Sequence, residues 1–412
     1  MTFAKSLSLS FCILLFAYTS TNFAIAQSTR DYHCITFDSV SHTIIVSCKN
    51  GTLSQVSAVL SDKNVLKEES KGIWHLNANL FLDKDSTFVI APYDTKWLKI
   101  NTPFGVKSLG NLIINSVKIT SWDDNSGTYP STDGTVPRPY LIEDNEATGQ
   151  MNITNSEIAY LGYAHFDRQG ITYIGGDGSV VSNNDIHDMW YGFYSAERAD
   201  ITITNNHIHD NERYGIDPHT GTHRMTIRNN TVGNIRDGIG IICSDKCSEI
   251  LIEDNVVYNA ARAGIMLDAT NESIVRNNVE YNSMGAGIAV HNSAINKVYN
   301  NTIYNNRYGV KISLNSTVNQ IIGNRISNSS DFGLCIMENS TRNDVKLNWI
   351  AGSKNYGICI VKGALRNNVE SNIISDSLLC GIIVNDYRLN VIKNNTLSSS
   401  DECAPVKIHK YF

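Results

Sequence analysis

Gly264-Ile265-Met266-Leu267-Asp268 and Gly287-Ile288-Ala289-Val290-His291 are two copies of a segment that returns along much of this chain. Each copy begins with glycine and then runs apolar, variable, apolar. An asparagine precedes most copies and recurs with a period of about 23 residues, within the range of solenoid repeats. The asparagines are Asn184, Asn206, Asn230, Asn255, Asn278, Asn301, Asn324, Asn348, Asn372 and Asn395. The glycines are Gly192, Gly215, Gly238, Gly264, Gly287, Gly309, Gly333, Gly357 and Gly381.

This repeat predicts an all-β fold, a right-handed parallel β-helix over residues 73–400. Short β-branched runs separated by Asn and Gly corners favour strands, and the helix formers that helical repeats need are absent. We expect the asparagines to stack into a hydrogen-bonded ladder. We expect the glycines to supply a backbone angle that other residues resist. The stretch from Asp123 to Pro139, rich in Asp, Ser, Gly and Pro, is predicted to be a long loop beside the binding face.

The two ends of the chain do not follow the repeat. Residues 1–26 read as a signal peptide, with the apolar run 7–18 and a small-x-small site at Ala24-Ile25-Ala26. Residues 27–72 are predicted to form an N-terminal cap with a short helix over 54–66, and residues 401–412 a C-terminal tail or cap. No later segment approaches the length of a membrane span. The mature chain is therefore expected to be secreted, at the cell surface or in a periplasm-like compartment, without stable membrane insertion.

Cysteine usage and charge restrict the environment and the partners. Nine cysteines become eight once Cys12 leaves with the signal, which suits an oxidising compartment. Cys34 with Cys48 and Cys335 with Cys359 are predicted disulfides, and Cys243 and Cys247 are expected to close a small loop. Asn-x-Ser/Thr sites permit glycosylation. The net charge of −6 leaves no basic footprint for nucleic acid, so an acidic polymer would have to meet local cations.

Strand alternation assigns the residues after each glycine to two faces. The first and third point inward, and the second and fourth point outward, so Asp217 and His219 share the solvent face of one strand. On neighbouring coils the same outward columns hold Tyr194, Met266, Asp268, His291 and Lys311. Because adjacent coils lie roughly 4.8 Å apart, these side chains form a row across which a linear polymer could lie.

Tyr214-Gly215-Ile216-Asp217-Pro218-His219 is the turn of the repeat that brings Asp, Pro and His together. It resembles the Tyr-Gly-x-Asp-Pro-His signature of mannuronan C5-epimerases, which convert mannuronate to guluronate within alginate. Residues 190–194 and 138–142 are similar to segments of the membrane-periplasm branch of that family. Residues 255–264 are similar to the coil that carries the catalytic arginine of the secreted branch. The resemblance covers roughly residues 110–290 and implies a β-helix fold and an isomerase activity on a polyuronate.

The reaction removes the C5 hydrogen beside a carboxylate, so it needs a base, a group that neutralises the carboxylate and a proton donor on the opposite face. The resemblance implies that His219 is the base and that Tyr214 is the donor, with water as the alternative. Asp217 would orient His219 or bind substrate. Arg262 would pair the uronate carboxylate. The remaining predicted substrate-binding residues are Lys246, Asp268, His291, Lys311, Tyr194 and Arg138.

Two positions depart from the family pattern. The residue after the histidine is Thr220 where the resembled branch has an acid, and Asp245 followed by Lys246 stands where that branch places an arginine. The neutralising cation is therefore open among Arg262, Lys246 and Lys311, with Arg262 preferred. No cofactor is predicted, and a contribution from calcium stays open. No metal site is predicted, because His187 and His209 recur at one corner as a ring stack would.

Four functions fit these residues to different degrees. An exported C5-epimerase is the leading prediction. A polysaccharide lyase uses the same base and the same neutralising group, and differs by expelling the 4-linked oxygen after proton loss. A glycoside hydrolase needs two carboxylates across the scissile bond, and the histidine between Asp217 and Asp268 favours proton abstraction instead. A non-catalytic β-helix that binds carbohydrate is the alternative outside enzymes, because a fold does not establish an activity.

Overall fold

The structure is a computed structural model that describes residues 32–385 and 389–398. The described residues from Cys34 onward belong to one compact unit. The predicted signal peptide (1–26) and the predicted tail (401–412) lie outside the described residues. None of the helices in the described part of the chain is long and apolar enough to cross a membrane.

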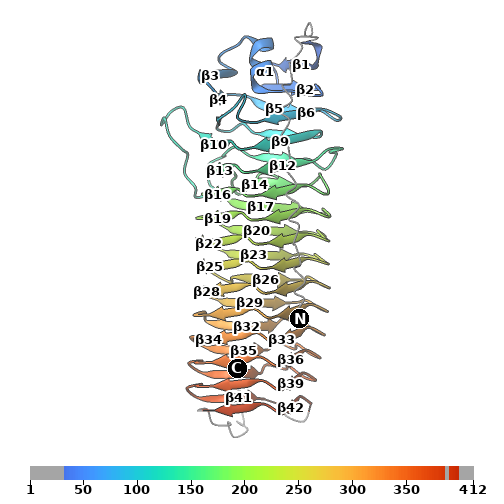
Figure 1. The fold of residues 1–412 in the computed structure, drawn as a ribbon, viewed down its shortest axis with the longest axis vertical. Coiled ribbons are helices and arrows are strands. Elements are labelled where there is room, and N and C mark those ends of the chain that lie inside the picture. Colours follow the sequence, from blue (N-terminus) through green and yellow to red (C-terminus); the bar gives the residue numbers. More distant parts are fainter. Residues whose placement is uncertain (1–31, 386–388, 399–412) are drawn as a thin grey trace, which may run out of the picture. The chain divides into compact units, whose positions relative to one another are not determined.

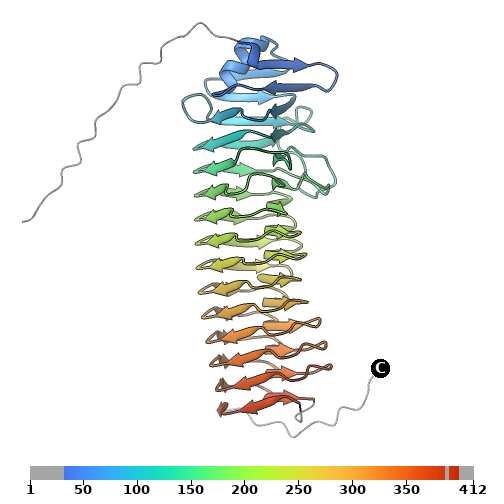
Figure 2. The ribbon, with the colours of Figure 1, turned by 90° about the vertical axis from the view of Figure 1, so that its right-hand side faces the viewer.

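The unit is a stack of coils in which each regular coil gives one short strand to each of three sheets (Figures 1 and 2). The first sheet contains β1 (Ile35–Asp38), β2 (Thr43–Val46), β5 (Asn79–Leu82), β8 (Val106–Ser108), β11 (Leu141–Glu143), β14 (Gly170–Tyr173), β17 (Tyr191–Ala196), β20 (Tyr214–His219), β23 (Ile239–Ser244), β26 (Ile265–Asp268), β29 (Ala286–His291), β32 (Tyr308–Ser313), β35 (Phe332–Ile336), β38 (Tyr356–Ile360) and β41 (Cys380–Val384).

The second sheet contains β3 (Leu66–Ser70), β4 (Ile73–Leu76), β7 (Trp97–Asn101), β10 (Lys118–Trp122), β13 (Glu157–Ala159), β16 (Asp185–His187), β19 (His207–His209), β22 (Thr231–Ile235), β25 (Val256–Ala260), β28 (Val279–Tyr281), β31 (Thr302–Tyr304), β34 (Arg325–Ser327), β37 (Trp349–Ala351), β40 (Ile373–Ser375) and β43 (Thr396–Ser398). The third contains β6 (Thr87–Ile90), β9 (Asn111–Asn115), β12 (Met151–Thr154), β15 (Val180–Ser182), β18 (Thr202–Thr204), β21 (Thr226–Arg228), β24 (Leu251–Glu253), β27 (Ile274–Arg276), β30 (Lys297–Tyr299), β33 (Gln320–Ile322), β36 (Asp344–Lys346), β39 (Asn368–Glu370) and β42 (Val391–Lys393).

The N-terminal end of the stack is closed by antiparallel pairs and a helix. After a short 3-10 helix, Tyr32–Cys34, strands β1 and β2 form a hairpin joined by the predicted Cys34–Cys48 disulfide. The helix α1 is Leu53–Leu60, with Thr52 and Gln55 in a capping box and Ser61 in the left-handed conformation. The expected helix over 54–66 was too long, because Leu66 begins β3, which pairs antiparallel with β4.

The core is built by the inward residues of the repeat. Ile265, Ile288 and Val310 are successive members of one inward column, and each is fully buried. Burial of an aliphatic side chain contributes about 1.5–3 kcal/mol, and the column repeats this contribution coil after coil. The alternation predicted from the sequence is confirmed for these positions.

The predicted asparagine ladder is present. Nδ2 of Asn301 donates to Oδ1 of Asn324 over 2.9 Å, and the backbone N–H of Asn301 donates to the same oxygen over 3.0 Å. The pattern holds between successive members from Asn184 to Asn395. A second ladder, which the sequence reading missed, connects Asn296, Asn319, Asn343, Asn367 and Asn390 at another corner.

The glycine prediction was wrong in its reason and at one position. The repeat glycines do not have positive φ; the corners do, as at Asn277 (φ 55°) and Asn300 (φ 55°). Glycine is needed because a Cβ on Gly215 would lie 2.5 Å from the carbonyl oxygen of Gly240 on the next coil. Tyr214 pairs with Ile239, so Gly240, and not Gly238, continues the column.

The cysteine predictions had mixed outcomes. Cys335 and Cys359 are paired residues on β35 and β38 and form the predicted disulfide between adjacent coils. Cys243 and Cys247 are free and buried, so the expected small disulfide loop was wrong. The reason is register: Cys243 is an inward residue that pairs with Leu267, while the thiol of Cys247 lies 3.4 Å from the carbonyl oxygen of Pro218.

Candidate active site

Strand β20 carries the unusual hexapeptide on the outer face of the first sheet. Ile216 is fully buried in the core, so the residues between inward positions point out of the stack. Asp217 pairs with Tyr194, and His219 pairs with Ala196, on the coil before. On later coils Asp268 pairs with His291, and Ala289 with Lys311. The outward columns predicted from the repeat are confirmed.

His219 is held at one ring nitrogen by a hydroxyl. Its Nδ1 lies 2.5 Å from Oγ1 of Thr220, which donates to Oδ2 of Asp245 over 3.3 Å. Because the Thr220 proton is used on Asp245, Nδ1 of His219 is the donor to Thr220, and Nε2 keeps its lone pair. Burial lowers the pKa of His219, against the opposing charges of Asp245 and Asp268. The imidazole is therefore neutral at pH 7, as a general base must be.

Asp217 faces outward but is not exposed to solvent, contrary to the prediction. Its exposed fraction is 1%, and Oγ of Ser244 donates to Oδ1 over 3.4 Å. In the part of the chain that the structure describes, no Lys or Arg forms an ion pair with it. Burial raises the pKa of Asp217 well above its ordinary value. The raised pKa favours the protonated carboxyl, a form that can donate a hydrogen bond.

Three hollows adjoin one another on this face. A pocket of about 350 Å³ surrounds the hexapeptide, lined by Gln169, Tyr191, Tyr194, Tyr214, Asp217, His219, Ile242, Ser244 and Asp268. A groove of about 510 Å³ continues over the later coils and shares Tyr214, Ile242 and Asp268 with the pocket. On the other side, a hollow lined in part by Asp144, Glu146 and Asp167 shares Tyr194. A track therefore crosses several coils, with the hexapeptide near its middle.

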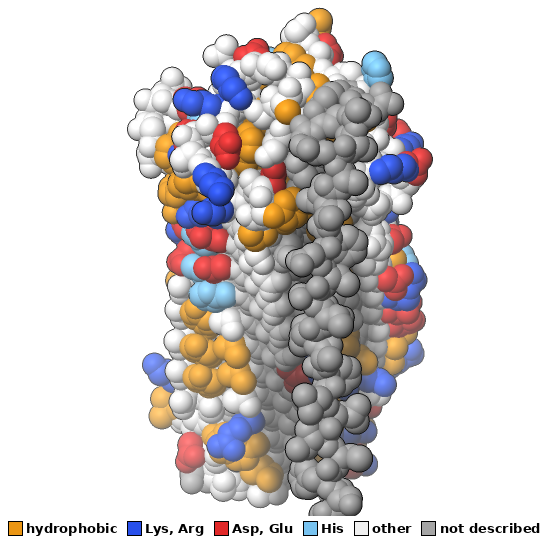
Figure 3. All heavy atoms as spheres, turned by 45° about the horizontal axis from the view of Figure 1, so that its top comes forward, with side chains coloured by type: hydrophobic (Ala, Val, Ile, Leu, Met, Phe, Trp, Pro, Cys, Tyr) orange, Lys and Arg blue, Asp and Glu red, His pale blue; other side chains and the backbone are white. Residues whose placement is uncertain are grey.

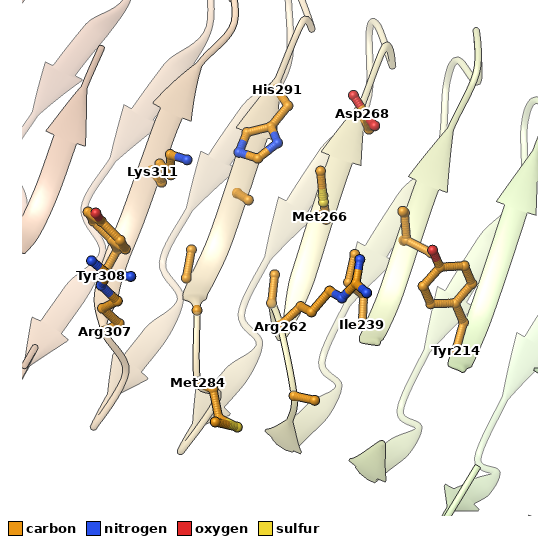
Figure 4. A pocket seen from close by; sticks show the side chains of 16 residues that line it. Tyr214, Ile239, Arg262, Met266, Asp268, Met284, His291, Arg307, Tyr308 and Lys311 are labelled. Atoms are coloured by element: carbon orange, nitrogen blue, oxygen red, sulfur yellow. The ribbon is translucent and has the colours of Figure 1, made fainter. Parts of the chain in front are cut away.

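Basic side chains line the groove beside an apolar floor (Figure 4). Met266, Ala286 and Ala289 form part of the floor, and Arg262, Arg307 and Lys311 are its basic residues. Figure 4 shows the guanidinium of Arg262 on the side of Tyr214. Arg262 is exposed and makes one 3.4 Å ion pair with Asp237, so its guanidinium is accessible to an anion.

The other predicted binding residues differ in placement. His291 lines the groove, its Nε2 has no hydrogen-bond partner, and burial together with Lys311 lowers its pKa to about 4. Lys246 is exposed at the turn after β23 and lines neither the pocket nor the groove. Arg138 is fully buried, and it donates to the carbonyl oxygens of Gly162 (2.6 Å) and Asp188 (2.8 Å). It anchors the long loop and is not available to a polymer on the surface, contrary to the prediction.

The long loop between β10 and β11 reaches down the stack. Nη1 of Arg236, just after β22, donates to Oγ1 of Thr132 in the loop over 3.0 Å. The backbone N–H of Ala164 donates to the carbonyl oxygen of Gly134 over 3.1 Å. The loop predicted over 123–139 thus crosses several coils at the side of the first sheet.

Sequence reasoning missed several residues of the site. Tyr191, Gln169 and Ile242 line the pocket, and Arg307 lines the groove. Tyr191 and Arg307 stand at corner positions of the repeat, and nothing in the repeat separates a corner that faces the track from one that faces solvent. Asp245 was noticed only as a departure, and its contact with Thr220 depends on how two adjacent coils are superposed.

Comparisons with known proteins agree with this geometry. Residues 114–247 match the family model described as "Right handed beta helix region", and residues 219–356 match "Periplasmic copper-binding protein (NosD)". The chain is 33% identical over 163 residues to the mannuronan C5-epimerase of Pseudomonas aeruginosa, which covers 36% of this chain and 30% of that protein. It is 29% identical over 174 residues to that of Pseudomonas putida, which covers 39% and 33%.

The structural similarity is wider than the sequence similarity. A crystal structure of a mutant of the periplasmic alginate epimerase AlgG has a TM-score of 0.74 with 20% identity, and it covers 86% of this chain and 85% of that one. The sequence matches span only about a third of the length of these two curated relatives. The chain is a right-handed parallel β-helix protein whose sequence is similar in part to mannuronan C5-epimerases.

Proposed function

We propose that this protein is an exported polyuronate C5-epimerase that converts mannuronate to guluronate residues in an alginate-like polymer. The observation that carries the proposal is His219, whose Nδ1 is bonded to Thr220 and whose Nε2 has no hydrogen-bond partner among the described residues, beside the buried Asp217 on one surface track. The similarity to mannuronan C5-epimerases in part of the sequence, and the similarity in fold to an alginate epimerase, support the same assignment.

The site residues divide the reaction into two proton transfers. Nε2 of His219 takes the C5 proton, and the electron pair of that bond moves into the adjacent carboxylate group. Asp217 donates a hydrogen bond to this group, and Arg262 pairs with it. The Tyr214 hydroxyl then returns a proton to C5 from the opposite face and regains one from water. The hydroxide that this leaves takes the C5 proton from Nε2 of His219, so both side chains return to their starting states. No atom is gained or lost by the polymer, so only the configuration at C5 changes.

The track explains how a protein with a net charge of −6 accepts a polyanion. Arg262, Arg307 and Lys311 bring positive charge to the groove, and the apolar floor contacts sugar-ring faces. The hollow on the other side of Tyr194 is lined by four acidic residues against two basic ones, Lys107 and Arg198, and this excess of carboxylates disfavours uronates there. We therefore place the bound polymer mainly over the groove, with one residue at the hexapeptide.

The compartment and cofactor requirement follow from the same proposal. The disulfides Cys34–Cys48 and Cys335–Cys359 suit an oxidising, exported location, and the similar alginate epimerase of known structure is periplasmic. The two proton transfers use side chains alone. We expect activity in the presence of a chelator, and a loss restored by calcium would show that the ion takes part.

Proton NMR of polymannuronate tests the function. Incubation with the purified mature chain in deuterated buffer is expected to produce guluronate signals and deuterium at C5. The His219→Ala variant is expected to produce neither, and His165→Ala, an exposed loop histidine, serves as the matched control. An unsaturated product absorbing in the ultraviolet would instead establish a lyase, and polymer binding without exchange would establish a binding protein.

A further inference from the structure

Strands β16 and β19 of the second sheet bring an unusual group of side chains together. Asp185 pairs with His207 and His187 pairs with His209 on adjacent coils, while Ile186 and Ile208 between them are fully buried. All four polar side chains therefore point outward. Figure 3 shows histidine and acidic side chains gathered on the left flank, the side on which Figure 1 labels β16 and β19. This group lies on a different sheet from the hexapeptide.

Three of these side chains converge on one point. Oδ1 of Asp185 lies 3.0 Å from Nε2 of His209 and 3.3 Å from Nδ1 of His207. One ligand atom from each of the three residues lies within 4.8 Å of the others. Two imidazole nitrogens and a carboxylate oxygen are a ligand set typical of zinc and other first-row divalent ions.

A contact with Asp210 fixes which ring nitrogen of His209 faces Asp185 and His207. Its Nδ1 lies 2.6 Å from Oδ2 of Asp210, so this nitrogen carries the donated proton. In the neutral ring, Nε2 then presents a lone pair to the Asp185 carboxylate, and two acceptors face each other at 3.0 Å. A cation between them, or a second proton on the ring, is required. A carboxylate on the far nitrogen is the arrangement that orients metal-bound histidines.

Charges around the group leave it net negative. Glu157 pairs with Lys118 (2.7 Å) and Asp188 pairs with Arg236 (2.7 Å). Asp185 and Asp210, in contrast, have only histidine partners among the ion pairs of residues 32–385 and 389–398. With neutral imidazoles, the two carboxylates attract a divalent cation.

We propose that Asp185, His207 and His209 bind one first-row divalent transition-metal ion, with zinc as the representative ion. Three protein ligands leave a further coordination position for water or an outside group. His187 stacks on His209 with ring centroids 5.2 Å apart, but its nitrogens face Asp188 and Glu157, so it supports the ring and is not a ligand. The ring stack of His187 and His209 predicted from the sequence is present, and His209 is at the same time one of the three proposed ligands.

The ion would join two coils, because Asp185 belongs to one and both histidines belong to the next. Isothermal titration of the untagged full chain with zinc chloride at neutral pH is expected to show one saturable site. Asp185→Asn, His207→Ala and His209→Ala should each weaken binding by at least tenfold, and Asp210→Asn by about 10–100-fold as an outer-shell change. His165→Ala, a matched surface histidine, should bind as the wild type does.

Cobalt(II) gives a second measurement on the same proteins. The visible absorption of a low-coordinate cobalt site is expected in the wild type and the control, and not in the Asp185→Asn chain, which keeps the side-chain shape and therefore the fold. Absence of saturable binding to the wild type, or equal binding by wild type and the three ligand variants, overturns the proposal and leaves a protonated His209 as the explanation of the geometry. Neither result bears on polymannuronate conversion, which uses the first sheet.

Discussion

Nδ1 of His219 lies 2.5 Å from Oγ1 of Thr220, whose hydroxyl reaches Oδ2 of Asp245 on the next coil at 3.3 Å. The acid that follows the histidine in the resembled branch is absent here. The Thr220 hydroxyl links the His219 ring to a carboxylate of the next coil. This contact assigns the proton to Nδ1 and directs Nε2 toward the track.

Thr220→Val is expected to lower kcat for polymannuronate by roughly tenfold, with little change in KM, because the ring loses the partner that fixes its tautomer. Thr220→Ser keeps the hydroxyl and should retain most activity. The kcat of Asp245→Asn should lie between the values of Thr220→Val and Thr220→Ser. Thr231→Val, on the second sheet, is the control. Equal activity of the Val and Ser variants would show that Thr220 does not position His219.

The pH dependence of kcat/KM should have its acid limb below the ordinary histidine range. His219 acts as a base only when neutral, and burial lowers its pKa, so activity rises with pH through that lowered value and is complete by pH 7. The alkaline limb should come from loss of the Asp217 proton, because burial raises the pKa of Asp217. Asp217→Asn should abolish the alkaline limb. An alkaline limb that is unchanged in Asp217→Asn would show that the Asp217 proton does not control activity at high pH.

The three candidate cations should rank by their place in the track. Arg262→Ala is expected to reduce kcat/KM by about 100-fold, since loss of a charged hydrogen bond of this kind costs about 1.5–3 kcal/mol. Arg262→Lys keeps the positive charge and should retain part of the wild-type kcat/KM. Lys311→Ala should mainly raise KM, and Lys246→Ala should have little effect because Lys246 does not line the groove. A larger loss in Lys246→Ala than in Arg262→Ala would reverse the assignment.

Glu280 should make stability fall as pH rises. It is fully buried behind the groove, and burial raises its pKa to about 8, while Ser283 and Asn306 hydrogen-bond to it. Between about pH 4.3, the ordinary pKa of a glutamate, and pH 8, the folded state holds a proton that the unfolded state has lost. The free energy of unfolding therefore falls by about 1.4 kcal/mol for each pH unit in this range. Glu280→Gln should therefore raise Tm at pH 8 and have little effect at pH 4. Exposed Glu272→Gln is the control, and equal shifts at both pH values would contradict the buried-acid account.

The Cys335–Cys359 disulfide should stabilise the later coils. It closes a loop with a sequence separation of 24 residues, for which the loss of chain entropy in the unfolded state is worth about 3 kcal/mol. Thermal unfolding of Cys335→Ala/Cys359→Ala should show a lower Tm than the wild type under non-reducing conditions. Under reducing conditions the two proteins should converge, and a gap that survives reduction would assign the effect to packing instead.

The repeat was readable from the sequence because its constraints are local and periodic. Ile265 and Ile288 recur at a fixed distance from their glycines, so strand alternation alone placed them in the core. Asn301 and Asn324 recur at one corner, so their ladder could be predicted without coordinates. The second ladder was missed because its asparagines were not aligned as a second column.

The sequence alone determined the parallel β-helix, the outward columns and the hexapeptide, since periodicity and side-chain alternation are properties of the chain itself. The tertiary structure decided the burial of Asp217 and Arg138, the Thr220–Asp245 contact, and the convergence of Asp185 with His207 and His209. These features depend on which residues of successive coils superpose and on how a long loop packs across them. The number of residues differs from coil to coil, and the long loop does not follow the repeat. Which residues become neighbours is therefore decided only when the coils are stacked.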